Sequence, residues 1–163
     1  MISFMKYQFQ FKKRTHLKDF SYKGCHRYFI TICTSNRRVV FTDKIIVDRM
    51  ISDLKYLSDN YGFIVWAYCF MPDHVHFLIE GRRDDSDMRR FISMYKQKTG
   101  YWYKQQYQMS LWQINYYEHV LRNHEDMKAI VNYIFGNPVR DGIVEDCADY
   151  PFQGSFMFTI KQP

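Results

Sequence analysis

The fold is decided by residues 70–80, which read FMPDHVHFLIE. From His74 onward, core-type and other residues alternate as in a β-strand, where successive side chains point to opposite faces of a sheet. We therefore predict a strand over residues 74–80. Its core face carries Val75, Phe77 and Ile79. His74 and His76 then lie side by side on the opposite face, where two neutral imidazoles form half of a metal site.

The composition is that of a basic, globular protein. The chain has 163 residues, of which 47% are hydrophobic and 25% charged, so we predict a single domain over residues 1–163 with a real core. The net charge of +6 favours a polyanionic partner such as nucleic acid, and aromatic residues, at 19%, can stack on unpaired bases. We expect residues 1–27 to be a basic, solvated arm and residues 139–163 a turn-rich tail.

The cysteines and the lengths of the apolar runs indicate the cellular compartment of the protein. The four cysteines contain no Cys-x-x-Cys pair, and they are Cys25, Cys33, Cys69 and Cys147. The first residues lack the apolar core of a signal peptide, and no apolar run is long enough to span a bilayer. We therefore expect a cytoplasmic protein with free thiols and no membrane association.

Residue patterns before the His74 strand predict three further elements. Residues 28–34 are β-branched and aromatic, which favours a strand. Thr42 is placed to cap a helix that has Asp43 in its first turn and ends near residues 60–62. Residues 63–70 form a nearly continuous apolar run, which indicates a central strand.

Three more elements are predicted after the His74 strand. A long helix is expected over residues 86–107, although Gly100 weakens it. A strand or strand pair is expected from segments 111–113 and 116–121. A final helix, capped by Asn123 with Asp126 as an approximate capping box, is closed at residues 137–138. Its buried stripe is Met127, Ile130, Val131 and Ile134.

The order of these elements predicts an α+β fold. The first six give βαββαβ, the pattern of a ferredoxin-like antiparallel sheet with its helices on one face. The seventh is an extra C-terminal helix. On it, Tyr133 lies about 110° from the centre of the buried stripe, and Asn137 follows one turn later on the same face. A phenol near two histidines indicates a nucleophile that attacks a phosphate polarised by a divalent ion.

Three stretches together resemble the single-tyrosine HUH transposases, in particular the REP-associated tyrosine transposases. They are MPDHVH (71–76), WQ…YYEHVLR (112–122) and YIFGNPVRDG (133–142), and the likeness extends over about residues 28–152. In that family a His-hydrophobic-His pair binds Mg²⁺ or Mn²⁺, and a helix-borne tyrosine cleaves single-stranded DNA to leave a 5′-phosphotyrosine and a free 3′-hydroxyl. The resemblance implies that His74, His76 and Asn137 are metal ligands and that Tyr133 is the nucleophile.

The resemblance also implies single-stranded or hairpin DNA as the partner, and a monomer or a homodimer. Arginine pairs at the predicted sheet ends are candidates for phosphate contact, namely Arg37, Arg38, Arg82 and Arg83. The chain departs from the family at Asp73, where asparagine is common, and at Asp141, where a small residue is frequent. Neither position is expected to touch the chemistry.

Several alternatives remain open from the sequence. Other tyrosines could supply the nucleophile, and the rivals are Tyr101, Tyr103, Tyr116 and Tyr117. His119, next to apolar residues, is expected to be structural. The same strand order builds RNA-recognition modules, which bind single strands on an aromatic sheet face without catalysis. A histidine-triad hydrolase is excluded because Leu78 stands where a third alternating histidine would be needed.

Overall fold

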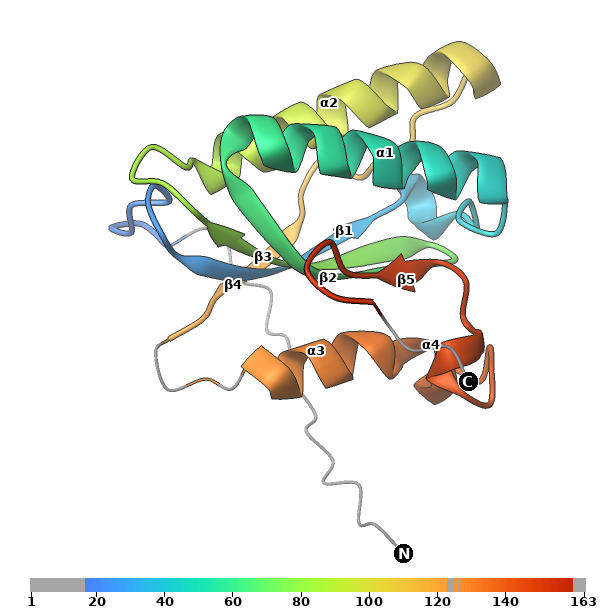
Figure 1. The fold of residues 1–163 in the computed structure, drawn as a ribbon. Coiled ribbons are helices and arrows are strands. Elements are labelled where there is room, and N and C mark those ends of the chain that lie inside the picture. Colours follow the sequence, from blue (N-terminus) through green and yellow to red (C-terminus); the bar gives the residue numbers. More distant parts are fainter. Residues whose placement is uncertain (1–16, 123–124, 126, 160–163) are drawn as a thin grey trace, which may run out of the picture.

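The chain forms one antiparallel sheet of five strands in the order β4-β1-β3-β2-β5 (Figure 1). The computed structural model describes residues 17–122, 125 and 127–159. The strands are β1 (Arg27–Cys33), β2 (Phe63–Met71), β3 (His74–Gly81), β4 (Tyr117–Val120) and β5 (Gln153–Gly154). The helices are α1 (Lys44–Tyr61), α2 (Met88–Tyr107), α3 (Met127–Phe135) and α4 (Asn137–Arg140), with 3-10 turns at Ser35–Arg37 and Cys147–Asp149. The predicted βαββαβ order and α+β class are confirmed.

Strand β3 is the centre of the sheet. It pairs with β1 on one side and with β2 on the other, so its backbone hydrogen bonds are satisfied along both edges. The register places Thr31 opposite His76 and Cys33 opposite His74. A strand held in this way keeps the directions of its side chains fixed, which positions both histidines.

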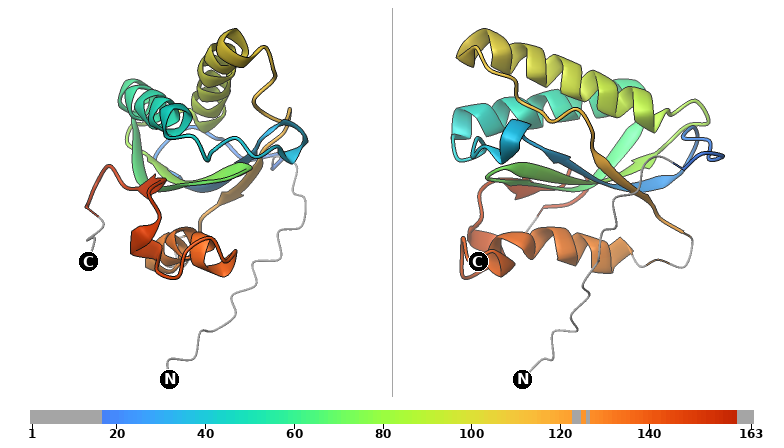
Figure 2. Two further views of the ribbon diagram at one scale, coloured as in Figure 1. Left: turned by 90° about the vertical axis from the view of Figure 1, so that its right-hand side faces the viewer. Right: turned by 180° about the vertical axis from the view of Figure 1, so that it is seen from behind.

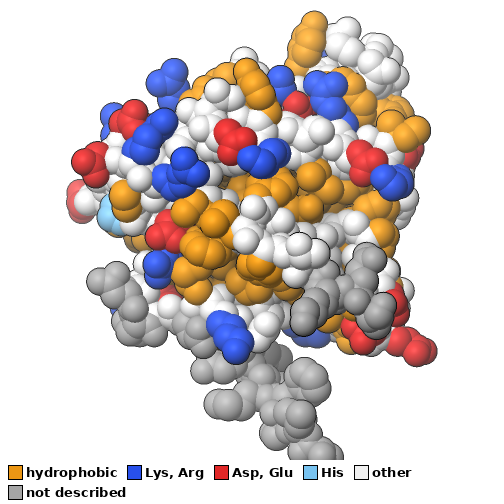
Figure 3. Space-filling model, in the orientation of Figure 1, with side chains coloured by type: hydrophobic (Ala, Val, Ile, Leu, Met, Phe, Trp, Pro, Cys, Tyr) orange, Lys and Arg blue, Asp and Glu red, His pale blue; other side chains and the backbone are white. Residues whose placement is uncertain are grey.

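Helices α1 and α2 cover one face of the sheet (Figure 2). Val75, Phe77 and Ile79 point into the core between the sheet and these helices, as predicted, and all three are fully buried. The outer surface of α1 carries ion pairs at i,i+4 spacing, and acidic and basic side chains lie beside one another over this helix (Figure 3). This face supplies most of the apolar core.

Helix α3 covers the opposite face of the sheet (Figures 1 and 2). It packs a second apolar cluster against the strands, including Ile130 and Ile134 from the helix and Phe29 and Leu78 from the sheet. Both faces of the sheet are therefore covered by helices, which explains the almost continuous apolar runs of β1, β2 and β3. None of the described helices is both long and apolar enough to cross a membrane.

The first two helices begin one or two residues later than predicted. Asp43, and not Thr42, is the N-cap of α1, and its carboxylate accepts a hydrogen bond from the Ile45 amide at 2.8 Å. Asp87 caps α2 by accepting from the Arg90 amide at 3.1 Å. A carboxylate at the N-cap also interacts favourably with the helix dipole. Gly100 lies within α2, which continues to Tyr107.

The segment before α3 differs in detail from the prediction. Strand β4 is only four residues long, and residues 111–113 contribute a single bridge, from Trp112 to Thr34. Helix α3 ends at Phe135, and Gly136 is the N-cap of the separate turn α4. Pro138 has no N–H and cannot continue the hydrogen-bond ladder, so the axis is interrupted there. The predicted caps Asn123 and Asp126 lie outside the described residues.

Both terminal segments pack more closely than predicted. The arm, described from residue 17, buries Tyr22, whose carbonyl accepts from the Met88 amide at 3.0 Å, so its solvated-tail prediction is wrong for that part. The amide of Gly24 donates to the carbonyl oxygen of Ser86. The arm also passes close to Gly81, because a Cβ on Gly81 would stand 2.1 Å from the carbonyl oxygen of Gly24. At the other end, the Tyr150 hydroxyl donates to the Phe70 carbonyl at 2.6 Å, and β5 extends the sheet.

Candidate active site

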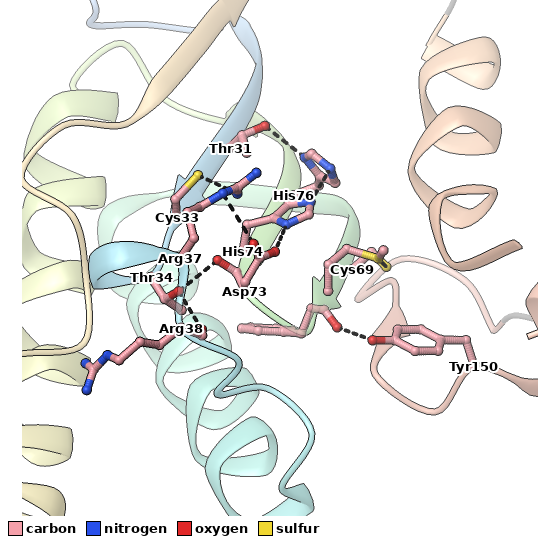
Figure 4. A network of polar contacts seen from close by, with 12 residues as sticks. Thr31, Cys33, Thr34, Arg37, Arg38, Cys69, Asp73, His74, His76 and Tyr150 are labelled. Carbon is pink, nitrogen blue, oxygen red and sulfur yellow. Dashed lines mark hydrogen bonds and ion pairs between the residues drawn. The ribbon is translucent and has the colours of Figure 1, made fainter. Parts of the chain in front are cut away.

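The two histidines of β3 face each other across a very short gap. Their rings are T-shaped with centroids 4.7 Å apart, and the two Nε2 atoms are separated by 3.2 Å (Figure 4). The side chain of His74 is 14% exposed, and His76 is 5% exposed. Two nitrogens each about 2.1 Å from one ion at right angles would be about 3 Å apart, so this pair fits a shared metal ion.

The other nitrogen of each ring has its own partner. The Nδ1 of His74 lies 2.6 Å from the carboxylate Oδ1 of Asp73, and the Nδ1 of His76 lies 2.8 Å from the hydroxyl of Thr31. Such contacts behind metal-binding histidines fix the ring orientation and the tautomer. The expectation that Asp73 would not touch the site is therefore wrong, because the carboxylate orients His74 directly.

The hydrogen-bond partners determine where the protons lie. A carboxylate only accepts, so Nδ1 of His74 carries the hydrogen and its Nε2 offers a lone pair. The Nε2–H of His76 can donate to that lone pair, while its Nδ1 accepts from the hydroxyl of Thr31. In the other tautomer the hydrogen of His76 would lie on Nδ1, the same hydroxyl would accept it, and Nε2 would carry a lone pair. Thr31 therefore serves both tautomers of His76.

Arg37 supports the pair from the adjoining loop. Its Nε lies 3.3 Å from Oδ2 of Asp73, and its Nη1 donates to the Sγ of Cys33 at 3.0 Å (Figure 4). Asn36 and Arg37 both adopt the left-handed conformation, with φ near +55°, which is uncommon outside glycine. The loop thus holds a strained shape that aims the guanidinium at Asp73. Burial raises the pKa of the Cys33 thiol, which keeps it protonated.

The other predicted arginines lie elsewhere. Arg38 ties its loop to the segment before β4 by donating to the carbonyls of Ser35 and Ser110. Arg82 and Arg83 follow the far end of β3, more than about 25 Å from His74 along the strand. Arg83 pairs with Asp85 at 3.0 Å. Of the four, the structure brings only Arg37 to the histidines.

The environment of His76 favours the neutral ring. Burial lowers its pKa well below 6.5, and the positive charges of Arg140 and Arg37 act in the same direction. Neutral imidazole is the form that binds metal ions. In the folded protein His76 is therefore neutral near pH 7.

Tyr133 is brought to this pair by helix α3. Its half-buried ring makes edge contacts with His76 at a centroid distance of 6.4 Å and with Phe29 at 6.0 Å. The guanidinium of Arg140 lies 4.2 Å from the centre of the phenol ring. Burial raises the pKa of Tyr133, whereas the charge of Arg140 lowers it. The structure thus places the predicted nucleophile beside the predicted ligand pair.

Asn137 occupies a different position from the one predicted. Because α3 ends at Phe135, it is the first residue of α4 rather than a later turn of the same helix. Its Nδ2 donates to the Ile134 carbonyl at 3.2 Å, replacing the bond that Pro138 cannot make. Its Oδ1 accepts from Arg140 at 2.6 Å. An amide oxygen has two lone pairs, so one remains for another partner.

The rival tyrosines divide between the two faces of the sheet. Tyr103 and Tyr116 pack on the α1–α2 side, and Tyr101 is exposed on α2. Tyr117, opposite Thr31 in β4, contacts Phe29 at 6.4 Å and so shares the face of His76. Of the four rival tyrosines, Tyr117 is therefore the one that remains a candidate for the nucleophile. His119, as predicted, has a structural partner, since its Nε2 lies 2.7 Å from Glu125.

Three residues of this site were not predicted to act there, namely Thr31, Asp73 and Arg140. Arg140 lies in α4, beyond the end of α3, so the helical periodicity that places Tyr133 does not identify it. Thr31 requires the strand register, which the sequence does not encode locally. Among the described residues, no group of three or more His, Cys, Asp or Glu side chains could hold a metal ion. Within the described part of the chain, a third protein ligand would therefore be of another type, such as the amide of Asn137.

Comparisons with known proteins agree with this arrangement. A family model described as "Transposase IS200 like" matches residues 22–137. A REP-associated tyrosine transposase of Escherichia coli K12 is 32% identical over 130 residues, covering 77% of this chain and 73% of the relative. A candidate REP-associated tyrosine transposase of Haemophilus influenzae is 32% identical over 156 residues, covering 88% and 86%.

A solved structure shares the fold. It is that of a REP-associated tyrosine transposase bound to a REP hairpin, and it superposes with a TM-score of 0.70 at 22% identity, covering 86% of this chain and 82% of the other. The family match spans most of this chain, and the relatives are matched over most of their own length. The chain therefore belongs to the IS200-like transposases, in the group of REP-associated tyrosine transposases.

Proposed function

We propose that the protein cleaves single-stranded DNA and transfers the strand through a 5′-phosphotyrosine at Tyr133. The observation that carries this proposal is the convergence of two Nε2 atoms, 3.2 Å apart, with a phenol ring against the second imidazole. Ligands for a cation and a nucleophile are then adjacent on one sheet face, as phosphoryl transfer requires. Family membership supports the same reaction class.

Both steps of the reaction balance without an external energy source. In the first, the phenol oxygen of Tyr133 bonds to phosphorus and the bond to the 3′-oxygen breaks. The phenol loses a proton and the released 3′-oxygen gains one. In the second, the 3′-hydroxyl of an incoming strand attacks the phosphotyrosine, and the phenol regains its proton. Each step exchanges one phosphodiester for another.

The cofactor we propose is Mg²⁺ or Mn²⁺, held by Nε2 of His74, Nε2 of His76 and Oδ1 of Asn137. When bound, such an ion neutralises charge that develops on the phosphate oxygens. Imidazole ligands favour Mn²⁺ over the harder Mg²⁺, so Mn²⁺ is the better probe. The chain's own contribution is to keep His76 neutral, to orient both rings from behind, and to hold the phenol beside them.

The partner we propose is hairpin DNA with a single-stranded flank. A solved relative is bound to a REP hairpin, and the net charge of +6 favours a polyanion. A labelled hairpin with a single-stranded flank should bind more tightly than a blunt duplex of equal length. Affinity should fall steeply with salt because bound counterions are released. Equal binding of both DNAs without a salt dependence would contradict this partner.

The alternative of a non-catalytic RNA-recognition module is less well supported. Such modules stack bases on an exposed sheet face. Here α1 and α2 cover one face and α3 covers the other, so that Phe29 is 3% exposed and Leu78 is fully buried. A base could stack on these strands only if a helix moved away.

A covalent-adduct assay tests the proposed function. A hairpin with a randomised single-stranded flank, labelled at its 3′ end, is incubated with the protein and Mn²⁺ and resolved on a denaturing gel. We expect a labelled adduct with the wild type and none with Tyr133→Phe or in EDTA. The matched variant Tyr117→Phe, on the same sheet face, should retain it. An adduct that persists in Tyr133→Phe and disappears in Tyr117→Phe would assign the nucleophile to β4.

A further inference from the structure

Arg140, at the end of α4, makes three contacts at the proposed nucleophile. Its guanidinium carbon lies 4.2 Å from the centre of the Tyr133 ring. Its Nη2 donates to the carbonyl oxygen of Tyr133 at 2.5 Å and to Oδ1 of Asn137 at 2.6 Å. One planar group therefore covers the phenol, fixes the backbone that carries it, and holds the nearby amide. The planar fork of arginine suits this combination, whereas lysine has no flat surface.

Gly136 makes room for this guanidinium. A Cβ at that position would stand 2.7 Å from Nη1 of Arg140 and 3.0 Å from the Asn132 carbonyl. The backbone of Gly136 is right-handed, with φ of −78°, a conformation open to any residue. The absence of a side chain thus lets the guanidinium of Arg140 approach closely, whereas the backbone conformation would accept any residue. Gly136 and Arg140 act as one structural unit.

We propose that Arg140 is a positioning residue for Tyr133, which orients the phenol by stacking on it and holds Asn137 at the adjoining turn. This inference rests on the proposed function, in which Tyr133 attacks phosphorus. The cation also opposes the effect of burial on the phenol, because its charge lowers the pKa of Tyr133. Since one lone pair of the Asn137 oxygen is bound to Arg140, the amide cannot rotate freely.

A purely structural role would look different in experiment. The last carbonyls of a helix lack backbone donors, and any cationic side chain can satisfy them. In that case Arg140→Lys would behave as the wild type, because an ammonium still donates to the Tyr133 carbonyl. Under the proposal, Arg140→Lys keeps the fold and loses the orientation of the ring. The two roles are thus separated by one conservative substitution.

The primary measurement is the NMR spectrum of ring-labelled tyrosine in the full chain, without DNA. The Tyr133 signal is identified by its loss in Tyr133→Phe. We expect it to shift in Arg140→Lys and in Gly136→Ala, which displaces the guanidinium from the other side. The matched control is Arg90→Lys, because Arg90 lies 5.6 Å from the Tyr61 ring on the opposite side of the sheet. That variant should leave the Tyr133 signal in place.

The second measurement is the rate of adduct formation with the randomised-flank hairpin at saturating concentration. Misplacing a nucleophile by about 1 Å is costly, so we expect a decrease of about tenfold or more in Arg140→Lys, with half-saturation within about threefold of the wild type. An unchanged Tyr133 signal, an unchanged saturating rate, or a change confined to half-saturation would each overturn the proposal. If the wild type forms no adduct, the proposed function fails, and the NMR signal alone decides the role of Arg140.

Discussion

The two faces of the sheet differ in the size of their apolar clusters and in the buried polar groups beside them. On the α1–α2 face, two long helices cover a large apolar cluster, and each helix begins at an aspartate cap. On the α3 face, one helix of nine residues covers a smaller cluster that adjoins buried polar groups, among them His76 and Asn137. Strand β3 alternates between these faces, so adjacent residues belong to different environments. The comparison shows that neighbouring residues of β3 serve different purposes, because one points into the large apolar core and the next points to the candidate site.

The sharpest way to test this separation is to remove the ligand pair. In the double variant His74→Ala/His76→Ala we expect Mn²⁺ binding to be lost, because both proposed nitrogen ligands are gone. Calorimetric titration measures this. Val75→Ala is the matched control, since Val75 lies between the two histidines and points to the other face. Binding that survives in the double variant would place the ion elsewhere.

The neighbouring pair His76 and Phe77 tests the same separation through stability. Phe77→Ala should lower the free energy of unfolding by about 3–5 kcal/mol, because the ring is fully buried among the α1–α2 core residues. His76→Ala should lower it by about 2 kcal/mol, since it removes two hydrogen bonds, to Thr31 and to His74, of about 1 kcal/mol each. Urea denaturation of the metal-free proteins compares them. Equal losses would mean that the two faces contribute alike.

A smaller effect on Mn²⁺ binding is expected from Asp73, which contacts the ring of His74 on the side away from His76. Asp73→Ala removes the group that orients His74 and should weaken Mn²⁺ binding by about 10- to 100-fold. Asp73→Asn is the matched variant, because an amide oxygen can still accept from Nδ1. It should bind Mn²⁺ nearly as tightly as the wild type. If Asp73→Ala binds Mn²⁺ normally, the ring is held by the strand alone.

The smallest effect concerns pH and the metal-free protein. Burial lowers the pKa of His76 in the folded state, so below about pH 6.5 the unfolded chain binds a proton that the folded chain does not. The free energy of unfolding should therefore decrease as pH falls from about 6.5 toward the folded-state pKa. Above that window the contribution is fully present. His76→Gln, measured in EDTA, should show a shallower decrease, and parallel curves would contradict the assignment.

The sequence predicted the fold well because its signal is periodic. The alternation in residues 74–80 identifies both faces of β3, and the helical spacing identifies the stripe of α3 that places Tyr133. Boundaries were less predictable. Thr42 and Asp43 are both good N-caps, and only the packed helix decides between them. Strand β5, two residues long, has no pattern that could be recognised.

The residues that meet at the site were predicted better than the contacts between them. His74, His76 and Tyr133 follow from residue type and spacing together with the family resemblance. The hydroxyl of Thr31 reaches His76 across paired strands that are 45 residues apart in the chain. The interruption at Pro138 also separates Asn137 from the helix of Tyr133, so that a face computed for one ideal helix does not describe it. Contacts that depend on register and on kinks require coordinates.

The hydroxyl of Thr31 has a consequence for how an ion would enter the site. Because it donates to one tautomer of His76 and accepts from the other, exchange between them moves only hydrogens. Loading as proposed would then need neither a net proton transfer to solvent nor a rearranged backbone at β3. The empty and loaded proteins would have the same heavy-atom framework, and the supply of the ion, rather than a folding event, would govern when the enzyme becomes competent.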